Sequence, residues 1–144
     1  MKITDSPITV EYQFNNSLLE VWRAITNLEE MKQWFFEDIP SFKAEAGFET
    51  SFIVHSEART FTHLWKITSV TELKQITYSW RYKEYPGDSF LTFKLVQENE
   101  GVMLQVRVDI IADFPDNIPE FDLESCRQGW HYFIGNRLKG YLRK

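Results

Sequence analysis

The most informative stretch of the chain is its C-terminal segment, DLESCRQGWHYFIGNRLKGYL, residues 122–142. At about 100° of rotation per residue, its apolar residues gather on one face of a helix. These residues are Leu123, Cys126, Trp130, Phe133, Ile134, Leu138 and Tyr141. Acidic residues near the start of the segment and basic residues near its end suit the helix dipole. The pattern predicts a long amphipathic helix whose apolar stripe packs against the rest of the protein.

The segments before this helix predict the sheet that it needs. Apolar and polar residues alternate from Ile8 to Phe14, which is typical of a strand with one wet face. From Phe42 onward the period is again mostly two, most clearly over residues 76–82. Short turns join these runs, so we expect an antiparallel meander of about six strands.

Two helices are predicted between the first strand and the meander. Ser17 and Glu20 have the spacing of a capping box at the start of one helix. Asn27 ends that helix, and residues 28–35 form a second, shorter one. The sequence therefore predicts an α+β fold in which a twisted antiparallel sheet curls around the C-terminal helix. A groove between sheet and helix follows from this arrangement.

Composition limits the classes of function. The 144 residues fit one domain, 1–144, and the net charge of −5 without a basic run argues against nucleic acid as a partner. The aromatic content of 16% favours a bulky core or an aromatic-lined cavity. Cys126 stands alone, which excludes an intramolecular disulfide and fits a reducing compartment. No run approaches the roughly 20 apolar residues of a membrane span, and residues 1–7 lack a signal-peptide pattern, so we expect a cytoplasmic protein.

Several segments resemble one known family. Residues 21–26, VWRAIT, followed by Trp34-Phe35, resemble the opening of AHSA1-type domains (activator of heat-shock protein 90 ATPase-like) of the START-like, or SRPBCC, superfamily. Residues 76–80, ITYSW, and 91–93, LTF, resemble the family's central strands. Gly129-Trp130 with residues 138–142 resembles its closing helix.

The resemblance implies a helix-grip (START-like/Bet v-like) fold with a cavity between the sheet and the C-terminal helix. Superfamily relatives bind lipids, sterols, polyketides and other apolar molecules, and some are cyclases or hydrolases. The chain departs from many relatives by having Ala46-Gly47 in place of a glycine pair and Trp65 near a position that is often glycine. A tryptophan there would fill space and reduce the cavity.

Arg137 is the sharpest candidate for a binding residue. On the helical wheel it lies within about 20° of Trp130, near the middle of the apolar stripe. A buried guanidinium needs a partner, so Arg137 could anchor a ligand carboxylate or phosphate. Alternatively it pairs with an internal acid, or its stem snorkels to the cavity mouth.

His63 is in phase with Phe61 and Trp65, so we expect it to point inward. There it could act as a general base or bond a ligand, or be a hydrogen-bonded core histidine. His55 and His131 are out of phase and should be exposed. The histidines are far apart in the sequence and the chain has one cysteine, so we predict no metal site.

The predicted cavity lining consists mainly of aromatic residues, which could equally be core. The full set is His63, Trp65, Tyr78, Trp80, Tyr82, Phe93, Trp130, Phe133 and Arg137. No phosphate loop, nucleophile elbow or HExxH motif is present, and we predict no catalytic residue and no cofactor.

Binding of a hydrophobic or amphipathic small molecule is the first functional hypothesis. The second is a protein-interaction domain of co-chaperone type, with a chaperone or a second copy of the chain as partner. The third, a small hydrolase or cyclase, requires Arg137, His63 and a tyrosine to converge on one pocket.

Overall fold

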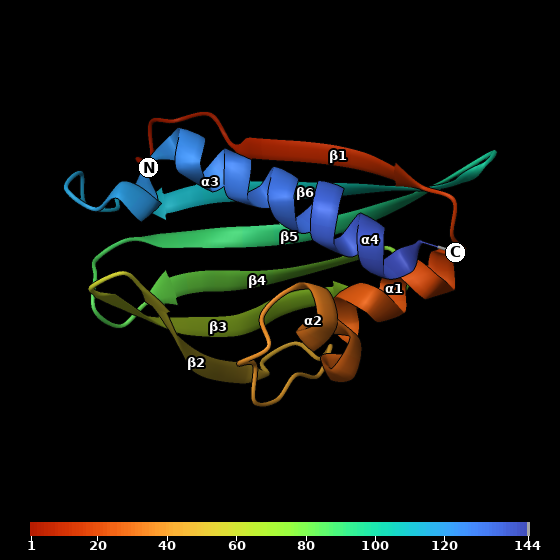
Figure 1. Cartoon of the computed structure of the whole chain (residues 1–144), viewed down its shortest axis with the longest axis horizontal. Helices are drawn as coiled ribbons and strands as arrows, with labels where there is room; N and C mark the ends of the chain where they lie inside the picture. Colours follow the sequence, from red (N-terminus) through yellow and green to blue (C-terminus); the bar gives the residue numbers. More distant parts are fainter. Residues whose placement is uncertain (144) are drawn as a thin grey trace.

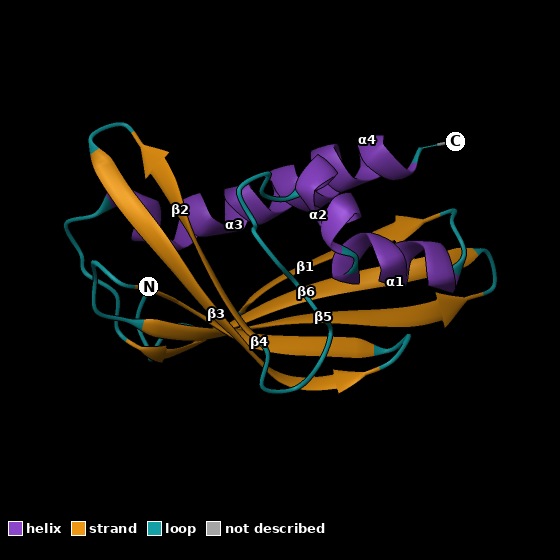
Figure 2. Ribbon diagram, turned by 90° about the horizontal axis from the view of Figure 1, so that it is seen from below, coloured by secondary structure: helices purple, strands orange, loops and turns teal. Residues whose placement is uncertain are grey.

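The computed structural model describes residues 1–143, and in it six antiparallel strands form one sheet whose helices all lie on one side (Figures 1 and 2). The strands are β1 Ile8–Phe14, β2 Glu49–Ser56, β3 Arg59–Thr71, β4 Gln75–Tyr82, β5 Asp88–Glu98 and β6 Gly101–Ala112. Their order in the sheet is β1-β6-β5-β4-β3-β2, so the first strand pairs with the last. The predicted helix-grip α+β fold is confirmed.

The meander has five strands rather than about six. Residues 42–48, where the alternation seemed to begin, remain outside the strands, and β1 completes the sheet by pairing with β6. Phe42 is nevertheless buried, because the loop folds back over the core. A register shift between Ile67 and Ser69 interrupts the β3–β4 ladder. Figure 2 shows the outer strands β2 and β3 curling toward the side of the helices.

The two short helices begin where the sequence predicts, and α2 ends at Trp34, one residue before the predicted end. In α1, Leu18–Thr26, the Ser17 hydroxyl and the Glu20 carboxylate form the reciprocal capping box. The Asn27 side chain then caps α2, Leu28–Trp34, by accepting from the amide of Glu30. A buried hydrogen bond from the Trp34 indole of α2 to the Ala24 carbonyl of α1 also joins the two helices.

The C-terminal helix is continuous but changes its winding. It comprises α3 Leu123–Trp130, a π-helical segment η2 His131–Leu138, and α4 Lys139–Leu142, and follows a 3-10 turn, η1 Pro119–Phe121. Every fourth residue is buried along it: Trp130, Ile134, Leu138 and Leu142. Because π turns hold more residues than α turns, the buried stripe departs from the wheel drawn at 100° per residue.

Tyr141 was wrongly placed on this stripe. It is 38% exposed and its hydroxyl donates to the Glu30 carboxylate of α2, while Leu142 takes the buried position. Gly135 allows the helix to lie close to β1, because a Cβ at this position would lie 2.8 Å from the Tyr12 ring. Within residues 1–143, no helix has the length and apolar character needed to cross a membrane.

Two buried tryptophans make a matched test of hydrogen bonding in this core. The indole nitrogen of Trp34 donates to the carbonyl of Ala24 at 2.7 Å, which ties α2 to the end of α1. The indole nitrogen of Trp65 is sealed in the core without a partner. Both side chains are almost fully buried, at 0% and 2% exposure.

We predict that Trp34→Phe lowers the free energy of unfolding by about 1–3 kcal/mol more than Trp65→Phe does, since only the first removes a made bond from a buried carbonyl. Urea unfolding of both variants and the wild type measures the difference. Equal losses would show that the Trp34–Ala24 bond contributes nothing beyond packing.

Candidate ligand-binding site

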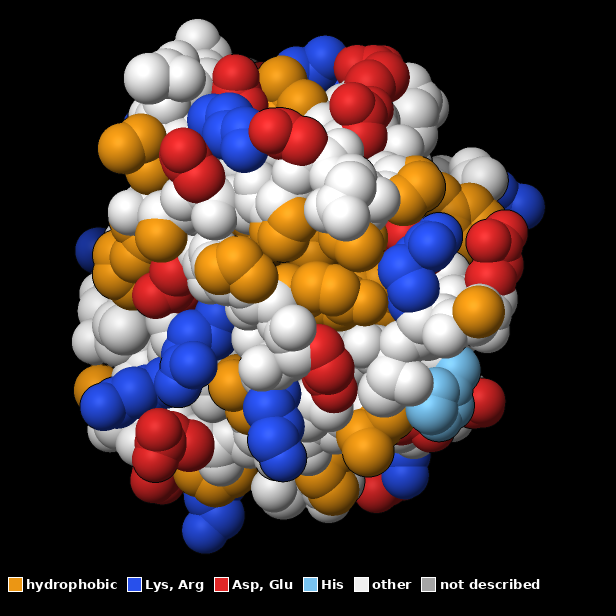
Figure 3. All heavy atoms as spheres, turned by 90° about the vertical axis from the view of Figure 1, so that its left-hand side faces the viewer, with side chains coloured by type: hydrophobic (Ala, Val, Ile, Leu, Met, Phe, Trp, Pro, Cys, Tyr) orange, Lys and Arg blue, Asp and Glu red, His pale blue; other side chains and the backbone are white. Residues whose placement is uncertain are grey.

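A hollow of about 300 Å³ opens between the sheet and the start of the C-terminal helix. The sheet side is formed by β2, β3 and β4, and the helix side by α3 and the first turn of η2. Figure 3, which looks onto the left-hand end of Figure 1, shows hydrophobic side chains gathered in a depression with charged side chains around it. Its walls are predominantly aromatic, with Phe36, Phe61, Trp80, Phe121, Trp130 and Phe133 among them.

Phe35 fills the space between sheet and helix at the inner end of the hollow. Its ring lies parallel to that of Trp34 at 4.7 Å and to that of Trp65 at 5.5 Å. Its edge contacts reach Phe133 at 5.1 Å and Phe93 at 6.3 Å. Because this one ring contacts the sheet and the helix together, the hollow is confined to one end of the grip.

The structure divides the predicted lining residues into three groups. Five line the hollow: His63, Trp80, Tyr82, Trp130 and Phe133. Trp65, Tyr78 and Phe93 lie instead in the core, with exposures of 2%, 0% and 0%. Strand alternation correctly predicted which side of the sheet these residues face. It could not predict which of them are covered by other core residues and which line the hollow.

Arg137, the remaining one, does not lie in the hollow. Its side chain is exposed, and its guanidinium donates to the backbone carbonyl of Gln33 at 3.2 Å. The π-helical winding between Trp130 and Arg137 accounts for this, because wider turns rotate Arg137 off the face that Trp130 occupies. The prediction that Arg137 occupies the apolar stripe was wrong.

His63 points inward as predicted and is 5% exposed. Its ring stacks on Phe52 at 4.7 Å and meets the edge of Tyr82 at 4.9 Å. Nδ1 lies 3.2 Å from the carbonyl of Phe61, and since a carbonyl only accepts, Nδ1 carries the proton. Burial lowers the pKa of the imidazole from 6.5 to about 4, so the ring is neutral at pH 7.

His55 is exposed as expected, but His131 is not. His131 is half-buried, and its Nδ1 lies 2.6 Å from the hydroxyl of Tyr12. This bond ties η2 to β1 on the side of the helix away from the hollow.

The polar groups of Trp80, Tyr82 and Cys126 also line the hollow. The Trp80 indole nitrogen donates to the Tyr82 hydroxyl at 2.7 Å. Burial raises the pKa of that hydroxyl well above its ordinary value, so it keeps its proton. Burial likewise raises the pKa of the Cys126 thiol to about 11, which makes it a small hydrophobe rather than a nucleophile.

The sequence did not indicate how the rim of the hollow is built. Glu120 of η1 accepts from the Arg59 guanidinium at 2.8 Å and from the Ser56 hydroxyl at 2.9 Å, which joins η1 to the β2–β3 hairpin. Phe121 contacts Phe61 at 5.6 Å beside this ion pair. Residues 114–119 carry no periodic pattern, so no signal in them predicted that η1 folds over the sheet.

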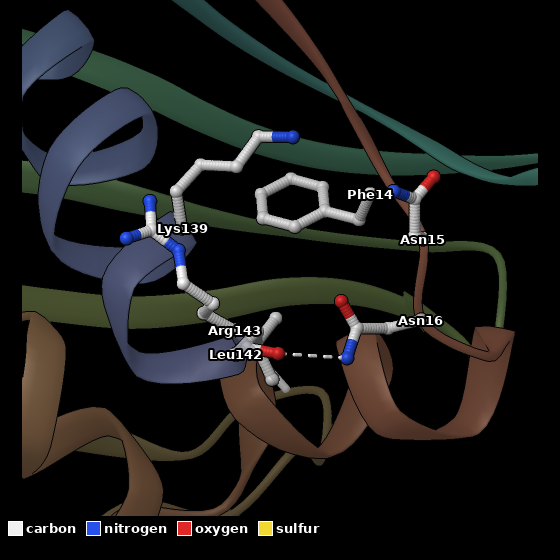
Figure 4. A pocket seen from close by; sticks show the side chains of 6 residues that line it. All are labelled: Phe14, Asn15, Asn16, Lys139, Leu142 and Arg143. Carbon is white, nitrogen blue, oxygen red and sulfur yellow. Dashed lines mark hydrogen bonds between the residues drawn. The ribbon is translucent and has the colours of Figure 1, made fainter.

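A second hollow, of about 430 Å³, lies at the opposite end of the C-terminal helix (Figure 4). Lys139 lies over the Phe14 ring at 4.4 Å, and the Asn16 amide donates to the Leu142 carbonyl at 3.0 Å. Arg143 and Asn15 complete a largely polar lining. This surface suits an apolar ligand poorly. Among residues 1–143, no group of three or more His, Cys, Asp or Glu side chains could hold a metal ion.

A sheet that grips a long helix over an apolar hollow defines a START-like protein. The family model described as Activator of Hsp90 ATPase homolog 1-like protein matches residues 16–143, and the chain belongs to this family. No curated protein matches the sequence significantly.

Solved structures share the fold at low sequence identity. The Mll3558 protein of Rhizobium loti has a TM-score of 0.82 at 16% identity, with 95% of this chain and 96% of that chain covered. The BH1534 protein of Bacillus halodurans has a TM-score of 0.74 at 22% identity, covering 96% and 98%. DynU16, from the dynemicin biosynthetic locus, has a TM-score of 0.76 at 19% identity. The match covers 97% of this chain and 48% of DynU16, so the chain spans about half of that protein.

Protonation of His63 should couple stability to pH. The pKa of His63 is about 4 in the folded protein and about 6.5 in the unfolded chain, so between these values the unfolded chain binds a proton that the folded protein does not. Acidification through this window therefore lowers the free energy of unfolding, by up to about 3 kcal/mol.

We predict that His63→Phe, whose ring can still stack on Phe52, loses less stability than the wild type between about pH 7 and about pH 4.5. Urea unfolding at the two pH values measures the loss, and the difference between the proteins isolates His63 from the carboxylates. The exposed His55 supplies the control, since His55→Gln removes a histidine that is not buried. An identical pH slope in all three proteins would refute the coupling.

Proposed function

We propose that the protein binds a small apolar or amphipathic molecule in the hollow between β2–β4 and α3. The aromatic hollow that opens beside Trp80 and Trp130 carries this proposal. Its volume of about 300 Å³ is at the lower end of the range for ligand pockets, which favours a compact ligand. Membership in a family with the START-like fold supports the same function by analogy of fold.

The position of Gly129 supports an open hollow rather than an imperfectly packed core. Gly129 lines the hollow, and a Cβ built there meets no heavy atom within 4 Å. A glycine inside a helix costs about 1 kcal/mol relative to alanine. The absence of a side chain at Gly129 leaves free space at the wall of the hollow, where an apolar side chain would fit.

The remaining features of the proposal are general ones. We place the protein in the cytoplasm, where the thiol of Cys126 stays reduced. We take residues 1–144 to act as one domain. The activity named in the family description, activation of the Hsp90 ATPase, is the alternative, and an ATPase assay of Hsp90 with this protein tests it.

We predict that Gly129→Leu strongly weakens binding in the hollow without unfolding the protein. The leucine side chain would occupy the hollow, and leucine also favours a helix over glycine by roughly 0.5–1 kcal/mol. The probe is 2-methylnaphthalene, and saturation-transfer NMR measures its affinity. We expect a loss of at least about tenfold in Gly129→Leu, since displacing the ligand from the hollow removes most of its buried area.

Gly140→Leu is the matched control for this experiment. Gly140 lies in the same continuous helix, is exposed, and also has no heavy atom within 4 Å of a built Cβ. The control should gain a similar helix preference and bind the probe as the wild type does. Undiminished binding by Gly129→Leu would overturn the proposed site, and so would wild-type protein that binds no naphthalene. Native mass spectrometry of freshly purified protein would reveal a ligand carried from the cell.

A further inference from the structure

His63 offers an unused hydrogen-bond acceptor to the hollow. Because Nδ1 donates to the carbonyl of Phe61, Nε2 holds the lone pair, and no described residue bonds to it. Within residues 1–143, the polar side-chain atoms sealed in the core without a partner are Trp65 Nε1 and the Tyr78 hydroxyl. Nε2 of His63 is not one of them, so this atom is not sealed in the core, and the residue that carries it lines the hollow.

Tyr82 offers the complementary donor. Its oxygen accepts the proton of the Trp80 indole, and its own hydroxyl proton has no acceptor among the described residues. The Tyr82 ring lies edge to face against His63, with centroids 4.9 Å apart. A free acceptor and a free donor therefore belong to neighbouring rings in the wall of the hollow, whose polar side chains also include Ser56, Glu120 and Ser125 near its rim.

The charges around the hollow restrict what can enter. Among the described residues, no lysine or arginine lines it, and Arg137 lies outside. Glu120 is the one acid in the lining, and it is paired with Arg59 at 2.8 Å. A carboxylate ligand would lose its hydration without meeting a cation, and an ammonium ligand would meet an acid that is already neutralised.

We infer that the ligand is an uncharged, flat molecule of one or two rings carrying a hydroxyl group. The hydroxyl donates to Nε2 of His63 and accepts from the hydroxyl of Tyr82, while the rings pack among Trp80, Trp130 and Phe133. A group that both donates and accepts satisfies both wall atoms at once, whereas a methyl group would leave both without a partner. This inference rests on the proposed function, because it names the ligand class of the same hollow.

Four naphthalenes substituted at position 2 test the inference: the hydroxyl, methyl, carboxylate and aminomethyl compounds, measured by saturation-transfer NMR at neutral pH. The quantity compared is the affinity for 2-naphthol divided by the affinity for 2-methylnaphthalene. Since a net hydrogen bond contributes about 0.5–1.5 kcal/mol, this ratio should fall about twofold to tenfold in His63→Phe. It should fall similarly in Tyr82→Phe.

Two further variants make the result specific. His63→Gln keeps an acceptor oxygen and should recover part of the lost ratio, whereas Arg137→Met should leave the ratio at its wild-type value. Binding of 2-methylnaphthalene by His63→Phe shows that the hollow is still formed in that variant. An unchanged ratio in His63→Phe would overturn the inference, as would tighter binding of the carboxylate or the ammonium compound. Failure of the wild type to bind any of the four would instead overturn the proposed function, and the inference with it.

Discussion

The packing of Phe35 between sheet and helix is the contact on which the rest of the arrangement depends. Its ring contacts Trp34 on α2, Trp65 on β3 and Trp130 on the C-terminal helix, so it joins three parts of the chain that are distant in sequence. Burial of such a side chain stabilises the fold by several kcal/mol. Phe35 follows α2 directly, and the capped α1–α2 corner fixes where it enters. The α1–α2 pair therefore places the ring that fills the space between the sheet and the C-terminal helix beside the hollow.

The same contact explains why the fold could be predicted more completely than the site. Alternation in β4 and the capping signals of Ser17 and Asn27 are local, so the strands and helices could be placed from the sequence. The extent of the hollow depends on where aromatic residues from outside the sheet pack on it, which is a property of tertiary packing. Tyr78 and Phe93 share a face with Trp80 but lie in solid core, because Phe42 packs on Tyr78 and Phe35 on Phe93. The position of these covering rings therefore decides which members of an inward face line the hollow.

Arg137 shows a second limit of sequence reasoning. A wheel drawn at about 100° per residue assumes one winding along the whole helix. The π-helical segment from His131 to Leu138 breaks that assumption. No residue type in this segment predicts a change from α-helical to π-helical winding. The consequence for function is large, since with Arg137 off the stripe no lysine or arginine among residues 1–143 lines the hollow. The hypothesis that Arg137 anchors a ligand anion is therefore dropped for this hollow, and the ligand that we propose is uncharged.

The contacts that hold the C-terminal helix are unequal at its two ends. Its middle is tied to β1 by the Tyr12–His131 bond, and its end is tied to the segment before α1 by the Asn16–Leu142 bond. The close approach of Gly135 to Tyr12 further fixes its distance from the sheet. Just before the helix, η1 is joined to the β2–β3 hairpin by the Glu120 bonds to Ser56 and Arg59 and by the buried contact of Phe121 with Phe61.

Surface ion pairs contribute little to stability, typically about 0–1 kcal/mol, whereas removing buried contacts costs several. The Glu120 bonds therefore contribute little, and η1 is held on the β2–β3 hairpin mainly by the buried Phe121, whose ring contacts Phe61 at 5.6 Å. The Phe121 ring also contacts Tyr82 at 5.1 Å and lines the hollow. The aromatic contacts that hold η1 on the sheet are thus also part of the wall that faces the candidate ligand.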